Sequence, residues 1–438
     1  MRLPHPEDVR KYLVSDLDAP YKVRMTITAE NKSAVQIAAL RSAAAVRERC
    51  AMVHRFVADG HSSHFTLDEA RLEDVADYVA QVTREAYPGL DIPYHSRWRH
   101  FSVGGRDRWR ELAASVRAHP MERARMAIDL VTVSVLLDAG AGDAWRYREP
   151  ATGLSFSRSE GLAVASLDMF RGGAFSCAPE RPYRVDDGAL AEIDAAKLAH
   201  HFGVNDANPL VGLDGRAALL RRLGRALAER GELFGCAPAR PGNLVDYFAS
   251  IAGGETIPAA DVLATLLESL AAIWPSGLVL DGFAIGDAGR HRAVRTGDAT
   301  SGIVPFHKLS QWLTFSLIEP LAAAGVEVGG IEELTALPEY RNGGLLIDIG
   351  AICPRGGIDR QRRHEVGGEL VVEWRALTVG LMDRLLPLVR DRLGLGAELT
   401  LPRMLQGGTW SAGRKIAREL RPPDGPPPLL VAADGTVF

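Results

Sequence analysis

The chain has 438 residues, of which 47% are hydrophobic and 24% are charged, as is typical of a globular protein. Its length allows one large domain or two to three ordinary ones. The net charge of −4 provides no basic excess, which argues against duplex nucleic acid as a partner but leaves a nucleotide-sized ligand open.

Composition also bears on compartment. No apolar run is long enough to span a bilayer, and the start MRLPHPEDVRKYL lacks the apolar core of a signal peptide. The four cysteines contain no CxxC pair, which argues against a zinc ribbon and suggests reduced thiols. We therefore expect a cytoplasmic protein with no membrane partner, and the sequence leaves its oligomeric state open.

Helical periodicity dominates the first two thirds of the chain. Apolar residues recur at helical spacing over residues 33–58, 125–137, 161–170, 189–202, 215–230 and 259–273. Two capping boxes predict helix starts, one formed by Thr66 and Glu69 and the other by Ser157 and Glu160.

The remaining third is also mainly helical. Residues 308–324 and 370–392 show helical spacing, whereas residues 277–283 and 345–352 are short strand candidates. No βαβ alternation and no GxGxxG after a strand are present, which argues against a dinucleotide-binding domain.

These patterns predict a mainly α protein, a single large helical body with a minor β element. We expect one domain over residues 1–438, in approximate halves 1–205 and 206–438. The second half carries most of the candidate site residues.

His307 and Lys308 follow Pro305 at the start of a predicted helix. A helix N-terminus favours anions, so a lysine there indicates a phosphate or carboxylate site. The alternative is a solvated lysine beside a capping histidine.

Gln311 lies one turn after Lys308 on the same helix face, next to Trp312. The glutamine is suited to reading the amide edge of a ligand, with the indole ring as a stacking wall. The alternative is that Trp312 belongs to the core and Gln311 lies at its rim.

Glu339 and Arg341 lie in LPEYRNGG, between a predicted helix and an apolar run. A carboxylate here is suited to act as a general base on water, and the arginine to bind an anion. A structural Glu–Arg pair at a turn explains the pattern equally well.

Three further candidates come from helices. Glu373 and Arg375 flank the apolar stripe of the long helix, where an arginine is either buried and paired or reaches out to solvent. Asp129 lies inside an apolar run and needs a partner, either a neighbouring element or a ligand hydroxyl. Because HExxH, GxSxG and GxxxxGK[ST] are all missing, we expect no catalytic metal.

Several segments carry a resemblance along the whole chain. They are YLVSDLDAP (12–20), LLDAGAGDAWRY (136–147), RSEGLAVASLDMF (158–170), NPLVGLDGRAALL (208–220), VPFHKLSQWLTFSL and LPEYRNGGLLID. In these segments the chain resembles the bacterial and fungal uracil-catabolism family named for the fourth gene of that pathway. The resemblance implies a pathway that opens the uracil ring with the ribose attached, leaving a ribosyl urea to be cleaved.

The last third is also similar to queuosine-salvage N-glycosylases, a helical family related in shape to DNA glycosylases. The positions that match its motifs are Lys308 and Gln311, then Leu334, Thr335, Tyr340 and Arg341, then Glu373, Arg375 and Ala376. The resemblance implies that fold and a catalytic carboxylate, which is an aspartate in that family and Glu339 here. Asp129 resembles the aspartate of its D-x-x-N-F segment, although the asparagine and the aromatic residue are missing.

Together these features predict an enzyme that hydrolyses the N-glycosidic bond of a ribosylated urea or ureido compound, expected to carry a 5′-phosphate. Glu339 is the expected base and His307 the expected proton donor. The expected substrate contacts are Asp129, Lys308, Gln311, Trp312, Tyr340, Arg341, Glu373 and Arg375. We expect no cofactor. The alternatives are an amidohydrolase acting on the ureido group and a non-catalytic protein that binds a metabolite of the same pathway.

Overall fold

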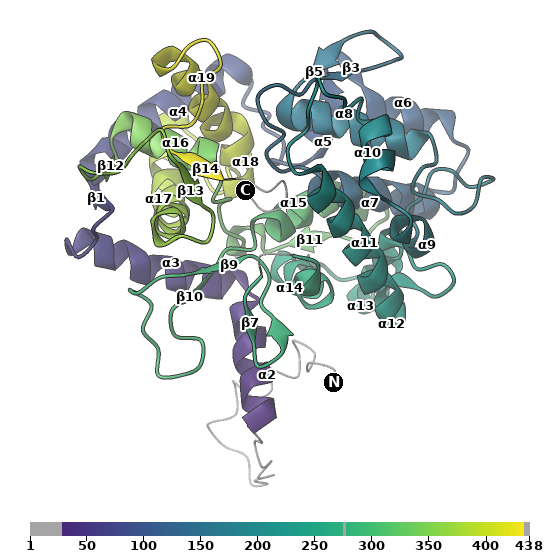
Figure 1. The fold of residues 1–438 in the computed structure, drawn as a ribbon, viewed down its shortest axis with the longest axis horizontal. Coiled ribbons are helices and arrows are strands. Elements are labelled where there is room, and N and C mark those ends of the chain that lie inside the picture. The colour runs from purple at the N-terminus through teal and green to yellow at the C-terminus, as the bar shows by residue number, and fades with distance from the viewer. Residues whose placement is uncertain (1–28, 275–276, 433–438) are drawn as a thin grey trace.

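The computed structural model describes residues 29–274 and 277–432. It confirms a mainly helical protein with a few short strands (Figure 1). The segment 12–20, part of the family resemblance, lies outside the described residues. Over the described part of the chain, no helix combines the length and hydrophobicity needed to cross a membrane.

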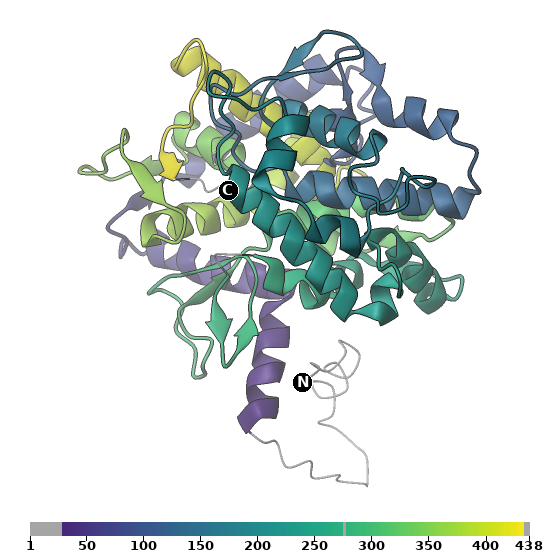
Figure 2. The same ribbon diagram turned by 45° about the vertical axis from the view of Figure 1, so that its right-hand side comes forward.

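Two groups of helices lie side by side, each around an apolar core (Figure 1). The terminal lobe combines segments from both ends of the described chain. Its helices are α3 (Ala43–Ala58), η1 (Glu69–Arg71), α4 (Leu72–Ala86), α16 (Tyr340–Ile349), α17 (Glu369–Leu393), α18 (Leu401–Met404), the π-helical turn η5 (Leu405–Thr409) and α19 (Trp410–Leu420). In the view of Figure 2, α2 (Ala29–Leu40) projects from the body below this lobe.

The middle lobe is built from the central part of the chain. Its helices are α5 (Trp98–Phe101), α6 (Arg108–Ser115), α7 (Pro120–Leu136), α8 (Arg158–Arg171), α9 (Asp187–Ala191), α10 (Ala195–His201), α11 (Leu213–Glu229), α12 (Gly231–Phe234), η2 (Pro241–Asn243), α13 (Leu244–Ala252), α14 (Ala259–Leu270), η3 (Ala271–Ile273), α15 (Lys308–Ala323) and η4 (Ile331–Glu333). The helix α15 packs against α7 and lies between the two lobes in Figure 1. Its first turn therefore has access to side chains from both lobes.

The described strands form two-stranded pairs only, several of which join distant segments. The antiparallel pairs are β1 (Phe65–Leu67) with β12 (Ile352–Pro354), β2 (Ser102–Val103) with β3 (Arg106–Asp107), β4 (Tyr147–Arg148) with β5 (Ser155–Phe156), β7 (Val279–Leu280) with β8 (Phe283–Ala284), and β9 (Ala288–Arg290) with β10 (Ile303–Pro305). The parallel pairs are β6 (Ile257–Pro258) with β11 (Val328–Gly329) and β13 (Arg363–Glu365) with β14 (Leu430–Ala432).

Two helix starts differ from the prediction. The helix expected over residues 33–58 is two helices, because Ser42 adopts an extended conformation and caps α3 through the Ala45 amide. The first capping box is wrong, since Thr66 lies in β1 and the helix α4 begins only at Leu72.

The strand predicted over residues 345–352 is also wrong, because most of it belongs to α16. Two glycines near its start lower helix propensity. One of them is required by packing: a Cβ at Gly343 would lie 2.6 Å from Nε1 of Trp374 on α17.

Candidate active site

The start of α15 is held by a clamp on the carboxylate of Asp287. Its Oδ2 accepts the backbone N–H of Lys308 (3.0 Å), and its two oxygens accept two hydrogen bonds from Arg375 (2.9 and 2.7 Å). Burial alone would raise the pKa of this carboxyl, but Arg375, the Lys308 amide and His307 hold it below its usual value. Arg375 is thus a positioning residue for Lys308, in place of the phosphate contact expected from the sequence.

His307 precedes α15 in the left-handed conformation, with φ 53° and ψ 36°. Its ring is fully buried, and Nε2 lies 3.0 Å from the carbonyl oxygen of Leu40 at the end of α2. Burial lowers its pKa to about 4, so the neutral ring donates this hydrogen bond. The geometry does not fit the proton donor expected from the sequence, because the N–H serves to fix α2.

Glu339 is the N-cap residue of α16 and is partly exposed. Its two oxygens accept the backbone N–H groups of Arg341 (2.7 Å) and Asn342 (2.6 Å). Burial raises the pKa of the carboxyl, while the two amides, Lys308 and Arg341 act in the opposite direction. The carboxylate is therefore held in one orientation and titrates closer to neutrality than an ordinary glutamate.

Lys308 opens α15, and several charged groups act on its pKa. It is only 7% exposed, and burial, followed by the neighbouring Arg375, lowers its pKa to about 8. The carboxylates of Asp287, Glu339 and Asp138 oppose this shift. Glu339 and Lys308 each act on the pKa of the other, so these two predicted residues interact electrostatically.

One turn further along α15, Trp312 belongs to an aromatic cluster with His95, His100 and Trp410. His95 stacks on Trp312 with ring centres 5.9 Å apart, and His100 meets Trp312 edge-on at 5.6 Å. Both histidines also contact Trp410 on α19, at 6.2 and 5.8 Å. The cluster therefore joins the two lobes, and Trp312 has the core position that was one of its two expected alternatives.

Gln311 anchors the segment that leads to Glu339. Its Oε1 accepts the backbone N–H of Thr335 (2.8 Å), and its Nε2 donates to the hydroxyl of Thr335 and the carbonyl of Phe306 (3.2 Å). The side chain is fully buried. These contacts fit a tether between α15 and α16 rather than the ligand contact expected from the sequence.

Arg341 and Tyr340 open α16 beside the carboxylate. The guanidinium of Arg341 lies 4.8 Å from the Tyr340 ring centre and donates to the carbonyl of Gly425 (2.9 Å). Arg341 is only 4% exposed, so this contact fixes the C-terminal segment against α16. Its backbone N–H, rather than its side chain, is what reaches Glu339.

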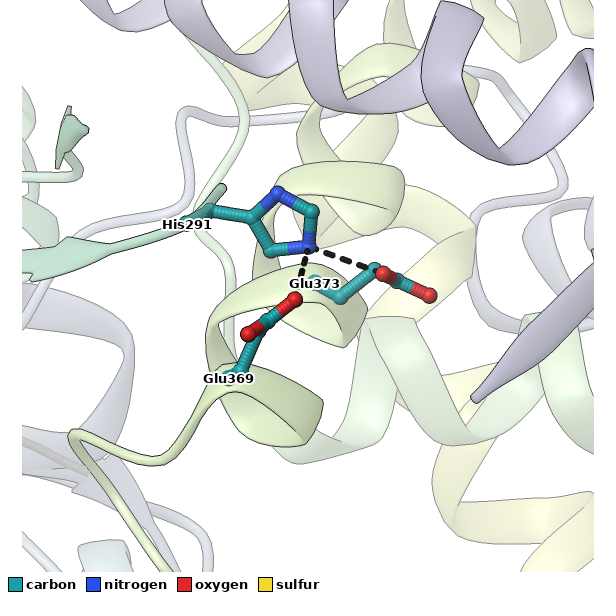
Figure 3. Close-up of side chains that lie close together, drawn as sticks. All are labelled: His291, Glu369 and Glu373. Carbon is teal, nitrogen blue, oxygen red and sulfur yellow. Dashed lines mark hydrogen bonds and ion pairs between the residues drawn. The ribbon is translucent and has the colours of Figure 1, made fainter. Parts of the chain in front are cut away.

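Glu373 belongs to a separate cluster with His291, which follows β9, and Glu369, one turn earlier on α17 (Figure 3). Nε2 of His291 points toward both carboxylates, at 2.8 Å from Glu373 and 3.6 Å from Glu369. Ser62 donates a further hydrogen bond to Glu373. Glu373 is fully buried by these partners, which does not fit the substrate contact expected from the sequence.

The His291 cluster has the donor types of a divalent-cation site, but its hydrogen bonds disfavour one. Nδ1 of His291 accepts the backbone N–H of Ala293 (3.1 Å), so the neutral ring carries its proton on Nε2. That proton is donated to Glu373, whereas a metal ion would need the lone pair of Nε2.

Asp129 is fully buried in α7 and holds the middle lobe together. It accepts two hydrogen bonds from Arg240 (2.9 and 2.6 Å) and the backbone N–H groups of Gly242 (2.6 Å) and Val185 (3.1 Å). Of the two roles expected from the sequence, Asp129 therefore has the structural one, as the partner of a neighbouring element.

Several residues near Lys308 were missed from the sequence. Asp138 pairs with Arg97 (3.2 Å) and acts on the pKa values of His95 and His100 as well as Lys308. The segment YHSRWRH at 94–100 is rich in aromatic and basic groups, but no spacing rule connects it with α15.

Glu160 also gains a role that the sequence did not predict. It pairs with Arg414 of α19 (2.5 Å). Ser157 is the N-cap residue of α8, as predicted, but its side chain makes no capping hydrogen bond. This ion pair is a further link between the lobes.

The fold and the site define a mainly α-helical protein in which a buried lysine and a fixed carboxylate interact electrostatically. The chain belongs to the family described as "Protein of unknown function (DUF1688)", which residues 39–438 match.

Two relatives agree with this assignment. The chain is 40% identical to Protein urg3 of Schizosaccharomyces pombe over 383 residues, which cover 85% of this chain and 92% of that protein. It is 37% identical to Uracil catabolism protein 4 of Lachancea kluyveri over 433 residues, which cover 91% and 98%. The resemblance to the uracil-catabolism family is thereby confirmed.

Proposed function

We propose that this protein takes part in uracil catabolism by hydrolysing the N-glycosidic bond of a ribosylated urea or ureido compound, expected to carry a 5′-phosphate. The name of the Lachancea kluyveri relative supports the pathway. The observation that carries the reaction is the Glu339 carboxylate, which two backbone amides fix and whose pKa the buried Lys308 influences.

Hydrolysis of a glycosidic bond passes through a state with positive charge at C1 of the sugar. In the proposed step a water oxygen bonds to C1 while the C1–N bond breaks and its electron pair goes to nitrogen. Glu339 takes one proton from the water, and the leaving nitrogen takes one proton from a donor. The water is the only co-reactant.

Glu339 is suited to this role for two reasons. Each carboxylate oxygen has acceptor capacity left after its backbone hydrogen bond, so it can take the proton of a water. Its raised pKa makes it a stronger base than an ordinary carboxylate. Lys308, still mainly protonated at neutral pH with a pKa of about 8, would hold ribose or phosphate oxygens.

The test is to incubate the full chain with ribosyl urea and, separately, with its 5′-phosphate, and to follow released sugar and ammonia. We expect sugar release, and we expect Glu339→Gln to abolish it while Glu332→Gln, an exposed glutamate on η4, leaves it unchanged. Ammonia without sugar would contradict the proposal in favour of an amidohydrolase. Saturable binding without either product would contradict it in favour of a metabolite-binding protein.

A further inference from the structure

The aromatic cluster of His95, His100, Trp312 and Trp410 contains two buried polar atoms that the protein leaves unsatisfied. Among the described residues, Nε1 of Trp312 and Nδ1 of His100 have no hydrogen-bond partner. The two side chains belong to residues only 4% and 6% exposed. A buried polar atom without a partner costs free energy, so a ligand that supplies the partners would be favoured here.

The chemistry of these two atoms limits what the ligand can be. An indole nitrogen can only donate, so Trp312 requires an acceptor such as a carbonyl oxygen. A neutral imidazole can present either a proton or a lone pair at Nδ1. Burial keeps His100 neutral by lowering its pKa to about 4. A donor and a nitrogen of this kind on two rings in contact match a carbonyl oxygen next to an N–H group, which is the edge of an amide or ureide.

The aromatic rings also favour a planar ligand. His95 and Trp312 lie nearly parallel, with 24° between their planes, and His100 stands perpendicular to both Trp312 and Trp410 at 89°. A planar group suits contact with such rings, because aromatic faces gain most from stacked or edge-on contacts.

His95 is held in place by a side chain of the π-helical turn. Gln406 in η5 accepts from Nδ1 of His95 (3.1 Å) and donates to the hydroxyl of Tyr87 (2.9 Å). These bonds leave Nε2 of His95 as the acceptor of the ring. Single π-helical turns are rare and occur often at functional sites.

The cluster adjoins the proposed reaction centre. Trp312 is four residues after Lys308, so the two side chains share one face of α15. Asp138 raises the pKa of Lys308 and of both histidines, so one carboxylate acts electrostatically on the cluster and on the lysine.

We propose that His95, His100, Trp312 and Trp410 form the subsite for the leaving group of the substrate, a planar amide or ureide. That the bound group is the leaving group rests on the proposed function. That it is an amide or ureide rests on the cluster alone. In it, Trp312 donates to the carbonyl oxygen and His100 contacts the adjacent nitrogen. This gives the leaving group a hydrogen-bonding partner in place of His307, whose N–H is bound to Leu40.

The test uses N-methylurea, in which the methyl carbon stands for C1 of the sugar. Its binding to the full chain is titrated by saturation-transfer NMR for the wild type, Trp312→Phe and His100→Gln. Trp312→Phe keeps an aromatic ring but removes the N–H donor. The matched controls are Trp109→Phe on α6 and His364→Gln on β13, and the unfolding temperature of each variant shows that it is folded.

We expect saturable binding by the wild type and by both controls, and binding weaker by about tenfold or more in Trp312→Phe and His100→Gln. Equal binding by Trp312→Phe and the wild type, or no saturable binding by the wild type, would overturn the subsite.

Sugar release from ribosyl urea is measured on the same samples to separate the two proposals. If the wild type releases sugar and Trp312→Phe binds N-methylurea as tightly as the wild type, the subsite is overturned and the glycosidase proposal stands. N-methylurea binding that is lost in Trp312→Phe, without sugar release by the wild type, supports the amide site and overturns the glycosidase.

Discussion

Arg375 on α17 and Asp287 before β9 form a buried pair through two parallel hydrogen bonds of 2.9 and 2.7 Å. The same carboxylate accepts the first backbone N–H of α15. The pair thus connects the terminal lobe with the helix that carries Lys308 and Trp312.

We predict that Asp287→Ala destabilises the protein by about 3–5 kcal/mol, because it leaves the Arg375 guanidinium buried without this carboxylate. Sugar release should fall as well, since the first turn of α15 loses its cap. Urea unfolding measures the change. The control is Asp383→Ala, whose partly exposed pair with Arg47 (2.9 Å) should contribute about 0–1 kcal/mol. A loss in Asp287→Ala no larger than in the control would contradict the role of the clamp.

The fall of kcat/KM at alkaline pH, the alkaline limb of the pH profile, should follow the deprotonation of Lys308. If its ammonium group binds the substrate, kcat/KM falls by about tenfold per pH unit above a pH of about 8, where the buried lysine loses its proton. Lys308→Arg should move this limb to higher pH, whereas Lys415→Arg on the surface should not. A limb that stays in place in Lys308→Arg would remove Lys308 from the account.

Stability should change in the opposite direction over the same range. The pKa of Lys308 is lower in the folded state than its unfolded value of about 10.4, so the unfolded state binds more protons between these values. The contribution of this residue to stability therefore rises from pH 8 to about 10.4. Urea unfolding at pH 8 and 9.5, compared between wild type and Lys308→Arg, separates lost activity from unfolding.

Removal of metal ions should leave activity unchanged. The proton on Nε2 of His291 is donated to Glu373, so this cluster is complete without a cation. Sugar release is measured before and after dialysis against a chelator, with zinc binding followed by calorimetry. Activity that disappears with the chelator and returns with one equivalent of zinc would contradict this interpretation.

Close packing of α19 on α16 should make Gly413 intolerant of a side chain. A Cβ there would overlap the carbonyl oxygen of Arg341, whose N–H binds Glu339. We expect Gly413→Ala to cost about 1–3 kcal/mol in urea unfolding and to lower sugar release. Gly356→Ala, which meets no atom within 4 Å, is the control. Equal stability of the two variants would show that α19 can move without cost.

The long helices could be predicted from the sequence because their signal is local. The apolar stripes of α15 and α17 repeat at helical spacing, and the structure places both helices within one or two residues of the prediction. The start of α16 was missed, since glutamate is an uncommon N-cap and glycines follow it. Position 343 requires a glycine because a Cβ there would collide with Trp374, and no local pattern in the sequence reveals this contact.

The candidate site could be predicted only in part, because contacts between distant segments leave no local pattern in the sequence. Residue type and resemblance predict Lys308 and Glu339, but the contacts that hold Lys308, Arg375 and Glu373 in place involve residues distant in the chain. Asp287 and Arg375 are 88 residues apart, and Ser62 and Glu373 are 311 apart. Such pairs follow from tertiary packing, so the sequence could not distinguish a substrate-binding arginine from a clamped one.

The most direct test of the central claim, that Glu339 directs water to C1 of a ribosylated ureido compound, is the fate of the water oxygen. A single turnover of ribosyl urea or its 5′-phosphate in ¹⁸O-water is quenched, the sugar is reduced at once to block exchange, and the products are weighed by mass spectrometry. We predict one ¹⁸O at C1 of the sugar, unlabelled urea, and no product with Glu339→Gln. An ¹⁸O in the product that contains the ureido carbonyl carbon, together with an unlabelled sugar, would contradict the account. Full turnover by Glu339→Gln would contradict it as well.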